Sequence, residues 1–153
     1  MNAPAAIRND PVSKARLRLW LKLLSASRQV EGTLRERMRA EMGSTLPRFD
    51  VMAALSRAPD GLRMSEVSSR LGVSPGGLTG IVDRLVAEGL VDRRAAQGDR
   101  RALLVRLTPE GEAEFARLAA AHEGWVDALF APLGPGDMAD LAALLDRIPR
   151  QEG

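Results

Sequence analysis

Residues 64–85 read MSEVSSRLGVSPGGLTGIVDRL, a pattern typical of two short helices joined by a tight turn. On the first helix Val67 and Leu71 lie four residues apart and so share one face. Ser65 is a residue type that caps helix N-termini, and Gly72 supplies the left-handed conformation that often ends a helix. We therefore expect a first helix of about two turns.

The second helix is expected to begin with Ser74 as its cap and Pro75 at its first position, where a missing N–H does no harm, and to end at Gly89. Its apolar residues recur at helical spacing and predict one buried stripe of Leu78, Ile81, Val82 and Leu85. The opposite face is small and polar, with Gly76, Gly77, Thr79, Gly80, Asp83 and Arg84. Glycine costs about 1 kcal/mol against alanine in a helix, and close approach to another surface, such as a DNA major groove, is a reason to accept that cost. The alternative is a glycine-tolerant surface helix in any small α domain.

Two β-favouring runs follow at residues 90–94 and 102–107, joined by a loop at 95–101 that contains glycine and aspartate for the turn. This pattern predicts a β hairpin, the wing of a winged helix-turn-helix. Residues 90–107 hold two aspartates and five arginines, namely Arg93, Arg94, Arg100, Arg101 and Arg106. Arginines on such a loop can follow DNA phosphates or enter the minor groove. The alternative for a charge run is a solvated face.

Three segments together resemble the MarR family of bacterial transcription regulators. They are LGVSPGGLT at 71–79, DRLVAEGLV at 83–91, and the wing DRRA at 99–102, which runs into LTPEG at 107–111. The resemblance extends from about Leu17 to Ile148, and its wing signature is more specific than the helix-turn-helix, which many regulators share. It implies that Asp99 and Arg101 carry the wing motif, with Arg100 at or next to the tip, and that the terminal helices form a dimerisation layer.

The composition favours helix packing. The 153 residues contain 45% apolar side chains but only 3% aromatic ones and no tyrosine, so Leu, Ala, Val and Met must build the core. We expect one compact, mainly α chain with a two-stranded β wing. The absence of cysteine excludes disulfides, thiolate zinc sites and cysteine-based redox sensing in this chain. Without an apolar run of roughly 18 residues or a signal-peptide pattern, we expect a cytoplasmic protein that binds no membrane.

The pattern divides the chain into three regions. Residues 1–11 are expected to form a mobile arm, residues 46–107 the DNA-binding region, and residues 12–45 and 108–149 a helical dimerisation region. A helix from Val12 to about residue 42 is apolar on two sides and needs two packing partners, of which the second is a symmetry mate.

Three further helices complete the prediction. One opens at Pro47 and runs to about Arg57, before the turn Pro59-Asp60-Gly61. Another is capped by Thr108 and has Pro109 at its first position. A last helix ends at Pro149 and carries an apolar stripe of Leu141, Leu144, Leu145 and Ile148. Such short terminal helices need packing partners, which a dimer would supply.

The net charge of +2 hides a strong polarity along the chain. Residues 1–45 carry +5, residues 62–107 carry +3, and residues 108–153 carry −6. A basic N-terminal region and a basic wing are typical of a protein that binds a polyanion. The same division of charge also arises when solvated helices of opposite charge pair with one another.

The pattern gives no support to an enzyme. A single histidine and no cysteine leave neither a Cys-His pair nor a His-rich metal cage, and phosphate-loop and nucleophile-elbow motifs are missing. We assign no catalytic residue, no metal site and no cofactor. His122 lies on an apolar stripe, where histidine is more often a core or interface residue than a ligand contact.

We therefore expect a homodimeric, sequence-specific DNA-binding transcription regulator, a repressor that reads a near-palindromic operator on double-stranded DNA. The residues expected to contact DNA are Ser74, Pro75, Gly76, Gly77, Thr79, Gly80, Arg84, Arg93, Arg94, Asp99, Arg100 and Arg101. The alternative is a winged-helix module that binds a protein partner and no DNA.

A small-molecule effector is a further expected partner. An aromatic or acidic ligand is expected to release the DNA, because an apolar wall with cationic groups at its edge orients a carboxylate. The residues expected to line its pocket are Arg16, Trp20, Arg48, Phe49 and His122.

Overall fold

The computed structural model describes residues 10–150, apart from the side chains of Arg100 and Arg101. The predicted arm at residues 1–11 therefore lies largely outside the described part. The predicted end of the arm at residue 11 is two residues too far along the chain. Asp10 already caps the first helix by accepting a hydrogen bond from the Val12 N–H (3.0 Å).

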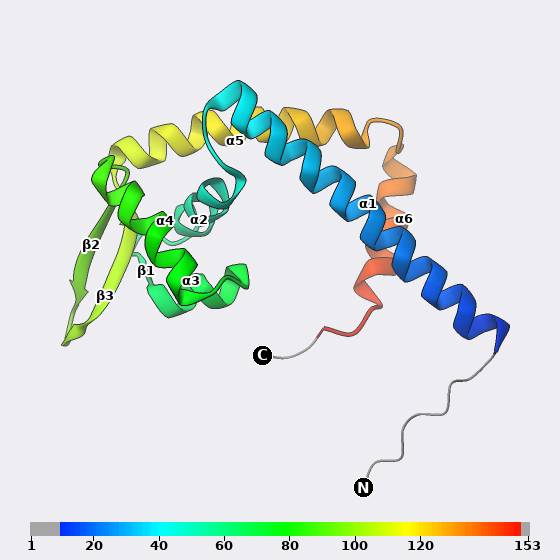
Figure 1. Ribbon diagram of the computed structural model, residues 1–153, viewed down its shortest axis with the longest axis horizontal. Helices are drawn as coiled ribbons and strands as arrows, with labels where there is room; N and C mark the ends of the chain where they lie inside the picture. Colours follow the sequence, from blue (N-terminus) through cyan, green and yellow to red (C-terminus); the bar gives the residue numbers. More distant parts are fainter. Residues whose placement is uncertain (1–9, 151–153) are drawn as a thin grey trace, which may run out of the picture.

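Two helices open the chain and lie at an angle to one another (Figure 1). Helix α1 (Pro11–Met42) is a single long rod, which Gly43 ends in the left-handed conformation at φ 60°. Helix α2 (Leu46–Ser56) follows at once, capped by Thr45, whose hydroxyl accepts a hydrogen bond from the Arg48 N–H (3.3 Å). The predicted extents of both helices are confirmed to within a residue or two.

Helices α3 (Met64–Leu71) and α4 (Pro75–Ala87) form the predicted helix-turn-helix. Gly72 and Gly89 adopt positive φ as expected, at 63° and 74°. The prediction that Ser65 caps α3 is wrong. The cap is Arg63, whose backbone N–H donates to the Glu66 carboxylate (3.0 Å), so the helix begins earlier and Ser65 lies in its first turn.

The wing differs from the prediction in two ways. Strands β2 (Val91–Ala96) and β3 (Asp99–Leu107) leave only Gln97 and Gly98 between them, with Gly98 at φ 85°, so the expected loop at 95–101 is mostly strand. The ladder recruits Ala95 and Ala96, residues of weak β propensity, by pairing them with Leu103 and Asp99. The sheet also has a third strand, β1 (Leu62–Arg63), in the antiparallel order β1-β3-β2, and two residues are too few to show alternation in a sequence.

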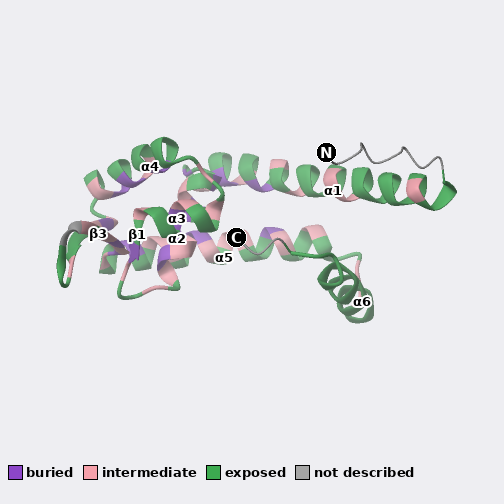
Figure 2. Cartoon of the chain, turned by 90° about the horizontal axis from the view of Figure 1, so that it is seen from below, coloured by how far each residue is buried: buried purple, intermediate pink, exposed green. Residues whose placement is uncertain are grey.

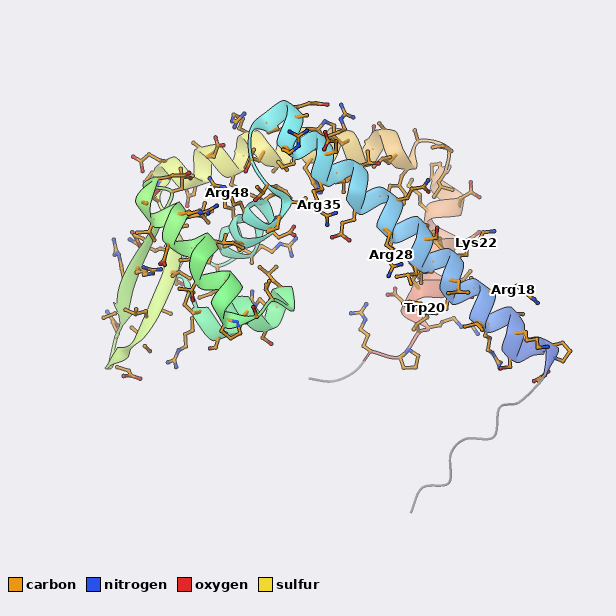
Figure 3. All side chains as sticks on the ribbon, in the orientation of Figure 1. Arg18, Trp20, Lys22, Arg28, Arg35 and Arg48 are labelled. Atoms are coloured by element: carbon orange, nitrogen blue, oxygen red, sulfur yellow. The ribbon has the colours of Figure 1, made fainter. Side chains whose placement is uncertain are left out.

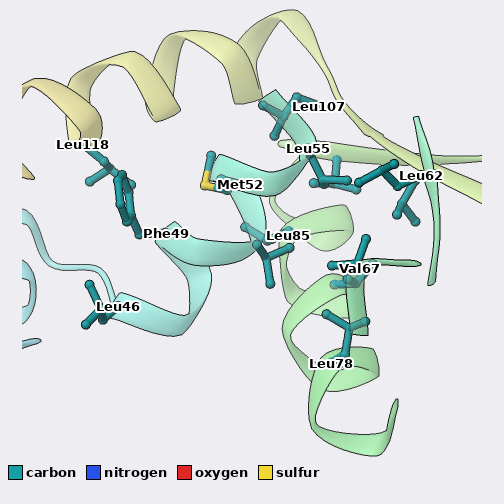
Figure 4. Close-up of a cluster of buried hydrophobic side chains, with 14 of the residues drawn as sticks. Leu46, Phe49, Met52, Leu55, Leu62, Val67, Leu78, Leu85, Leu107 and Leu118 are labelled. Carbon is teal, nitrogen blue, oxygen red and sulfur yellow. The ribbon is translucent and has the colours of Figure 1, made fainter. Parts of the chain in front are cut away.

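The core lies where α2 meets the helix-turn-helix and the sheet, a region that we call the head (Figures 2 and 4). Val51, Met52 and Leu55 of α2 are 0–1% exposed and belong to the same cluster as Val67 and Val105. The predicted stripe of α4 is confirmed: Leu78, Val82 and Leu85 are completely buried and Ile81 partly so.

Helix α5 (Pro109–Phe130) is anchored in the head at its first turn. The Thr108 hydroxyl accepts a hydrogen bond from the Gly111 N–H (3.0 Å) and donates to the Gly89 carbonyl (2.6 Å). Gly111 has to be glycine, because a Cβ there would lie 1.9 Å from the Leu90 carbonyl oxygen. The predicted cap Thr108 is confirmed.

Helix α6 (Pro135–Asp146) has no buried residue. It ends before Ile148, so that part of the predicted stripe lies beyond the helix. In residues 10–150 no single helix is long and apolar enough to cross a membrane, although α5 and α6 together pass that test, across a bend of 99°.

Candidate nucleic-acid interface

The N-terminal half of α4 presents a small, solvent-exposed surface. Ser74, Pro75, Gly76, Gly77, Thr79 and Gly80 are all exposed. The Ser74 hydroxyl accepts a hydrogen bond from the Gly77 N–H (3.3 Å), and the Thr79 hydroxyl donates to the Pro75 carbonyl (2.8 Å). Both hydroxyls thus lie against the start of the helix, where the helix dipole favours an anion.

The fold does not account for two of the three glycines on this surface. A Cβ at Gly76 or Gly80 would meet nothing within 4 Å, and only at Gly77 would it approach another atom, the Ser74 Oγ at 3.2 Å. Alanine at 76 or 80 would therefore fit and would stabilise the helix. An external surface that must come close to α4 is a physical reason for glycine there.

The arginines of this region fall into two groups. Arg93 on β2 pairs with Asp83 on α4, and Arg106 pairs with Asp92 at 3.1 Å, so both guanidinium groups have partners within the head. Arg94 lies 3.7 Å from Asp92, and its side chain is 61% exposed. Arg84 is exposed on α4, and among residues 10–150 its side chain has no hydrogen bond or ion pair. Of the predicted DNA-contacting arginines with described side chains, Arg84 and Arg94 are thus the most available.

The wing motif begins directly after the turn. Asp99 pairs with Ala96 at the start of β3, and it lines a surface recess together with Arg63 and Ser65. The backbones of Arg100 and Arg101 continue β3, so these residues belong to a strand and not to the predicted loop. Their side chains lie outside the described part of the structure.

Helix α3 adds residues that the sequence did not single out. A hollow between α3 and α4 is lined by apolar residues together with Ser65, Ser68, Ser69 and Thr79. Arg70 is exposed on α3, and among the described residues its side chain has no hydrogen bond or ion pair. The basic charge of residues 62–107 was a signal for Arg70, whereas the way in which α3 packs against α4 was not predictable from it.

The residues predicted to line a ligand pocket do not all come together. Phe49 stacks on His122 with ring centroids 4.5 Å apart, but Arg48 pairs with Glu88 at the end of α4. Trp20 is 54% exposed on the outer half of α1 (Figure 3). At 1.5 Å per residue it lies about 20 Å along the helix from the buried Leu34, and Arg16 lies farther out. Of the five, Phe49 and His122 are the pair that the fold brings together from two different helices.

A cavity of about 520 Å³ is lined by residues of α1, α2, α5 and α6, and of the five predicted residues His122 is one of its lining residues. His122 reaches it from α5, together with the carboxylates Glu31 of α1 and Asp50 of α2. Burial raises the pKa of the Asp50 carboxyl; the proximity of His122 opposes that increase, and Glu31 adds to it. In the described part of the chain no group of three or more His, Cys, Asp or Glu side chains is arranged to hold a metal ion.

The chain resembles known proteins in sequence. The family model for the MarR family matches residues 42–102. The regulator PecS of Dickeya dadantii is 32% identical over 104 residues, which are 67% of this chain and 63% of PecS. The repressor YetL of Bacillus subtilis is 29% identical over 114 residues, which are 74% of this chain and 68% of YetL. The chain thus spans about two thirds of these curated relatives.

It also resembles solved structures. A MarR family transcriptional regulator from Silicibacter pomeroyi is 31% identical with a TM-score of 0.76, covering 92% of this chain and 96% of that one. A mutant of E. coli MarR complexed with operator DNA is 25% identical with a TM-score of 0.76, covering 92% of this chain and 100% of that one. The winged head, the long terminal helices and the sequence likeness agree, and they show that the chain belongs to the MarR family.

Proposed function

We propose that the chain is a homodimeric transcription regulator that binds an operator with α4 in the major groove and the wing against the flanking backbone. The observation that carries this is the exposed start of α4, where Gly76 and Gly80 serve no contact inside the protein. The E. coli MarR mutant with the same fold is complexed with operator DNA, which supports the same use of this surface. Repression, rather than activation, is proposed from the name of YetL. Because a bacterial operator lies on the chromosome, binding to it implies that the protein is cytoplasmic.

The proposed dimer accounts for apolar side chains that the single chain leaves in solvent. On α1 these are Val12, Leu17, Leu19, Trp20 and Leu21, and at the C-terminal end they are Met138, Leu141, Leu144, Leu145 and Ile148, all at least 41% exposed. A two-fold axis through these helices would present two α4 helices to half-sites about one helical turn of DNA apart, hence to a near-palindrome. A stable monomer in sedimentation at micromolar concentration, with a footprint over one half-site, would contradict the dimer.

The test begins with operator sequences selected from random DNA and measures binding by fluorescence anisotropy. Gly80→Leu should abolish specific binding while leaving the unfolding transition in place, since a Cβ at Gly80 meets nothing. Gly80→Ala adds less bulk and should have a smaller effect. Ala116→Leu, at an exposed position of α5, is the matched control and should bind normally. Normal operator binding by folded Gly80→Leu would show that this face of α4 points away from DNA.

The salt dependence separates this proposal from a module that binds a protein partner through the same head. DNA binding through several phosphate contacts falls by orders of magnitude between about 50 and 200 mM salt, whereas an apolar protein interface does not. Selection that yields no DNA sequence, together with salt-independent binding of a protein partner, would favour the protein-binding module.

A further inference from the structure

The exposed side of the first two turns of α4 carries no side chain that reads a base by paired hydrogen bonds. Residues 75–80 hold no amide, guanidinium, ammonium or carboxylate group, and the exposed ones are Pro75, Gly76, Gly77, Thr79 and Gly80. In the third turn Asp83 pairs with Arg93, and Arg84 is the first long polar side chain that is exposed without such a pair. Residues at the N-terminal end of a recognition helix are the ones that contact base edges. In this chain they offer no bidentate contact to guanine or adenine.

The two hydroxyl groups at this end of α4 are engaged with the helix itself. The Ser74 hydroxyl caps the helix by accepting a hydrogen bond from the Gly77 N–H (3.3 Å). The Thr79 hydroxyl donates its single proton to the Pro75 carbonyl (2.8 Å). Thr79 therefore has no proton left to donate to a base. What this exposed side chain offers to DNA is its methyl group, together with an oxygen that can still accept a hydrogen bond.

Pro75 and Thr79 together form an apolar surface on α4. They lie four residues apart, so they are neighbours on one face of the helix. Both also border the hollow between α3 and α4, whose lining includes the apolar side chains of Met64 and Leu78. We call the Pro75 ring and the Thr79 methyl group the α4 patch.

The major groove offers one apolar group to such a surface. Thymine carries a C5-methyl group at its edge, whereas the other groups along the groove are hydrogen-bond donors and acceptors. An apolar surface placed against those polar groups displaces water without replacing its hydrogen bonds, which costs free energy. Against a thymine methyl group the same surface buries apolar area, which is favourable. The chemistry of the α4 patch therefore favours thymine over the other bases.

We infer that the α4 patch selects a thymine in each operator half-site by contact with its C5-methyl group, and that Thr79 is the residue that determines this specificity. The inference deepens, and rests on, the proposed function, in which α4 lies in the major groove. Gly76 and Gly80 follow Pro75 and Thr79 directly, and a Cβ at either glycine would meet nothing inside the protein. Without side chains there, the DNA can approach closely enough for contact with a methyl group.

The experiment measures the affinity of the full chain for the selected operator by fluorescence anisotropy. One symmetry-related pair of thymines at a time is replaced by uracil, which pairs as thymine does but lacks the methyl group. At the thymine that the α4 patch contacts, loss of one buried methyl group should weaken binding about fourfold, and its loss from both half-sites about fifteenfold. At the same position 5-methylcytosine, which carries a methyl group at the same place, should bind more tightly than cytosine.

Two variants of Thr79 separate its methyl group from its hydroxyl. Thr79→Ser removes the methyl group alone, so it should bind the parent operator more weakly and should no longer distinguish thymine from uracil. Thr79→Val removes the hydroxyl and should keep the preference for thymine, whereas a threonine oxygen that accepts from an adenine or cytosine amino group would lose its contact.

Thr33→Ser is the matched control for these variants. Thr33 is exposed on α1, and its hydroxyl donates to the Gln29 carbonyl (3.0 Å), four residues earlier, as the Thr79 hydroxyl does to Pro75. This variant should bind the thymine and uracil operators as the parent does. Urea unfolding checks that all three variants are folded.

Each of three results would overturn the inference. They are an operator in which no replacement of thymine by uracil weakens binding, a Thr79→Ser chain that prefers thymine as strongly as the parent, and a folded Thr79→Val chain without that preference. Failure to select any operator would overturn the proposed function and the thymine contact with it. A specific operator that is indifferent to uracil overturns the thymine contact alone.

Discussion

Breaking the ion pair between Asp83 and Arg93 tests whether Arg93 holds the wing in place or contacts a DNA phosphate, the role predicted for it from the sequence. Arg93 on β2 pairs with Asp83 on α4, so its guanidinium joins the wing to the helix that we place in the major groove. If this is its role, Asp83→Ala and Arg93→Ala remove the same interaction and should have similar effects on DNA binding. A phosphate-contacting Arg93 would behave differently, because Asp83→Ala would leave it free to contact DNA.

The size of the effect follows from exposure. The side chains of Arg93 and Asp83 are 32% and 54% exposed, so the pair is largely solvated. Such pairs contribute about 0.2–1 kcal/mol, and the coupling measured by a double-mutant cycle in urea unfolding should lie in that range. If the whole coupling were used to hold the wing in place, each single mutant would lose at most about fivefold in operator affinity.

The assay is operator binding by fluorescence anisotropy across a series of salt concentrations. A lost phosphate contact reduces the slope of log affinity against log salt by about 0.9, whereas a lost positioning contact lowers affinity without that change. We expect equal slopes for the parent, Asp83→Ala and Arg93→Ala. A slope reduced by about one in Arg93→Ala, with operator affinity intact or increased in Asp83→Ala, would refute this reasoning and return Arg93 to the phosphate contacts.

Three further predictions follow from the geometry. Arg84→Ala removes an exposed arginine without an intramolecular partner, so it should lower the salt slope by about one and leave the urea midpoint unchanged; a shifted midpoint with an intact slope would contradict it. Leu85→Ala empties a completely buried position and should cost about 2–5 kcal/mol in urea unfolding, and a cost well below 1 kcal/mol would be incompatible with this core. Asp50→Asn should raise the melting temperature at neutral pH. The raised pKa of Asp50 means that ionisation disfavours the folded state above that pKa, so the difference should disappear as the pH falls below the ordinary aspartate range, and a mutant less stable than the parent at neutral pH would argue against it.

Much of the fold could be predicted from the sequence because it depends on local interactions. Ser74 and Thr108 cap helices through hydroxyls that bond a backbone N–H three residues later, and Gly72 ends α3 with a left-handed residue. The stripe of α4 repeats at helical spacing because its members share one face. These features depend on residues a few positions apart, and their predicted places are confirmed.

Pairings between distant residues account for the errors in the fold. Strand β1 exists because Leu62 pairs with Val105, and Leu62 and Arg63 are too few residues to form a strand alone. Ala95 and Ala96 are strand residues because β3 supplies their hydrogen-bonding partners. The cap of α3 falls on Arg63, which also ends β1, rather than on the favoured residue type Ser65.

The candidate interface shows the same division. Residue types and spacing were enough to place Thr79, Gly80 and Arg84 on the outer face of one helix, since the helical repeat alone fixes that face. The sequence could not show which charged side chains form pairs. Arg93 finds Asp83 on a neighbouring element, Arg48 finds Glu88 40 residues away, and Asp50 lies close to His122 of α5. Electrostatic and packing energies depend on distances in space, and for residues on different elements those distances are set when the helices and strands pack together.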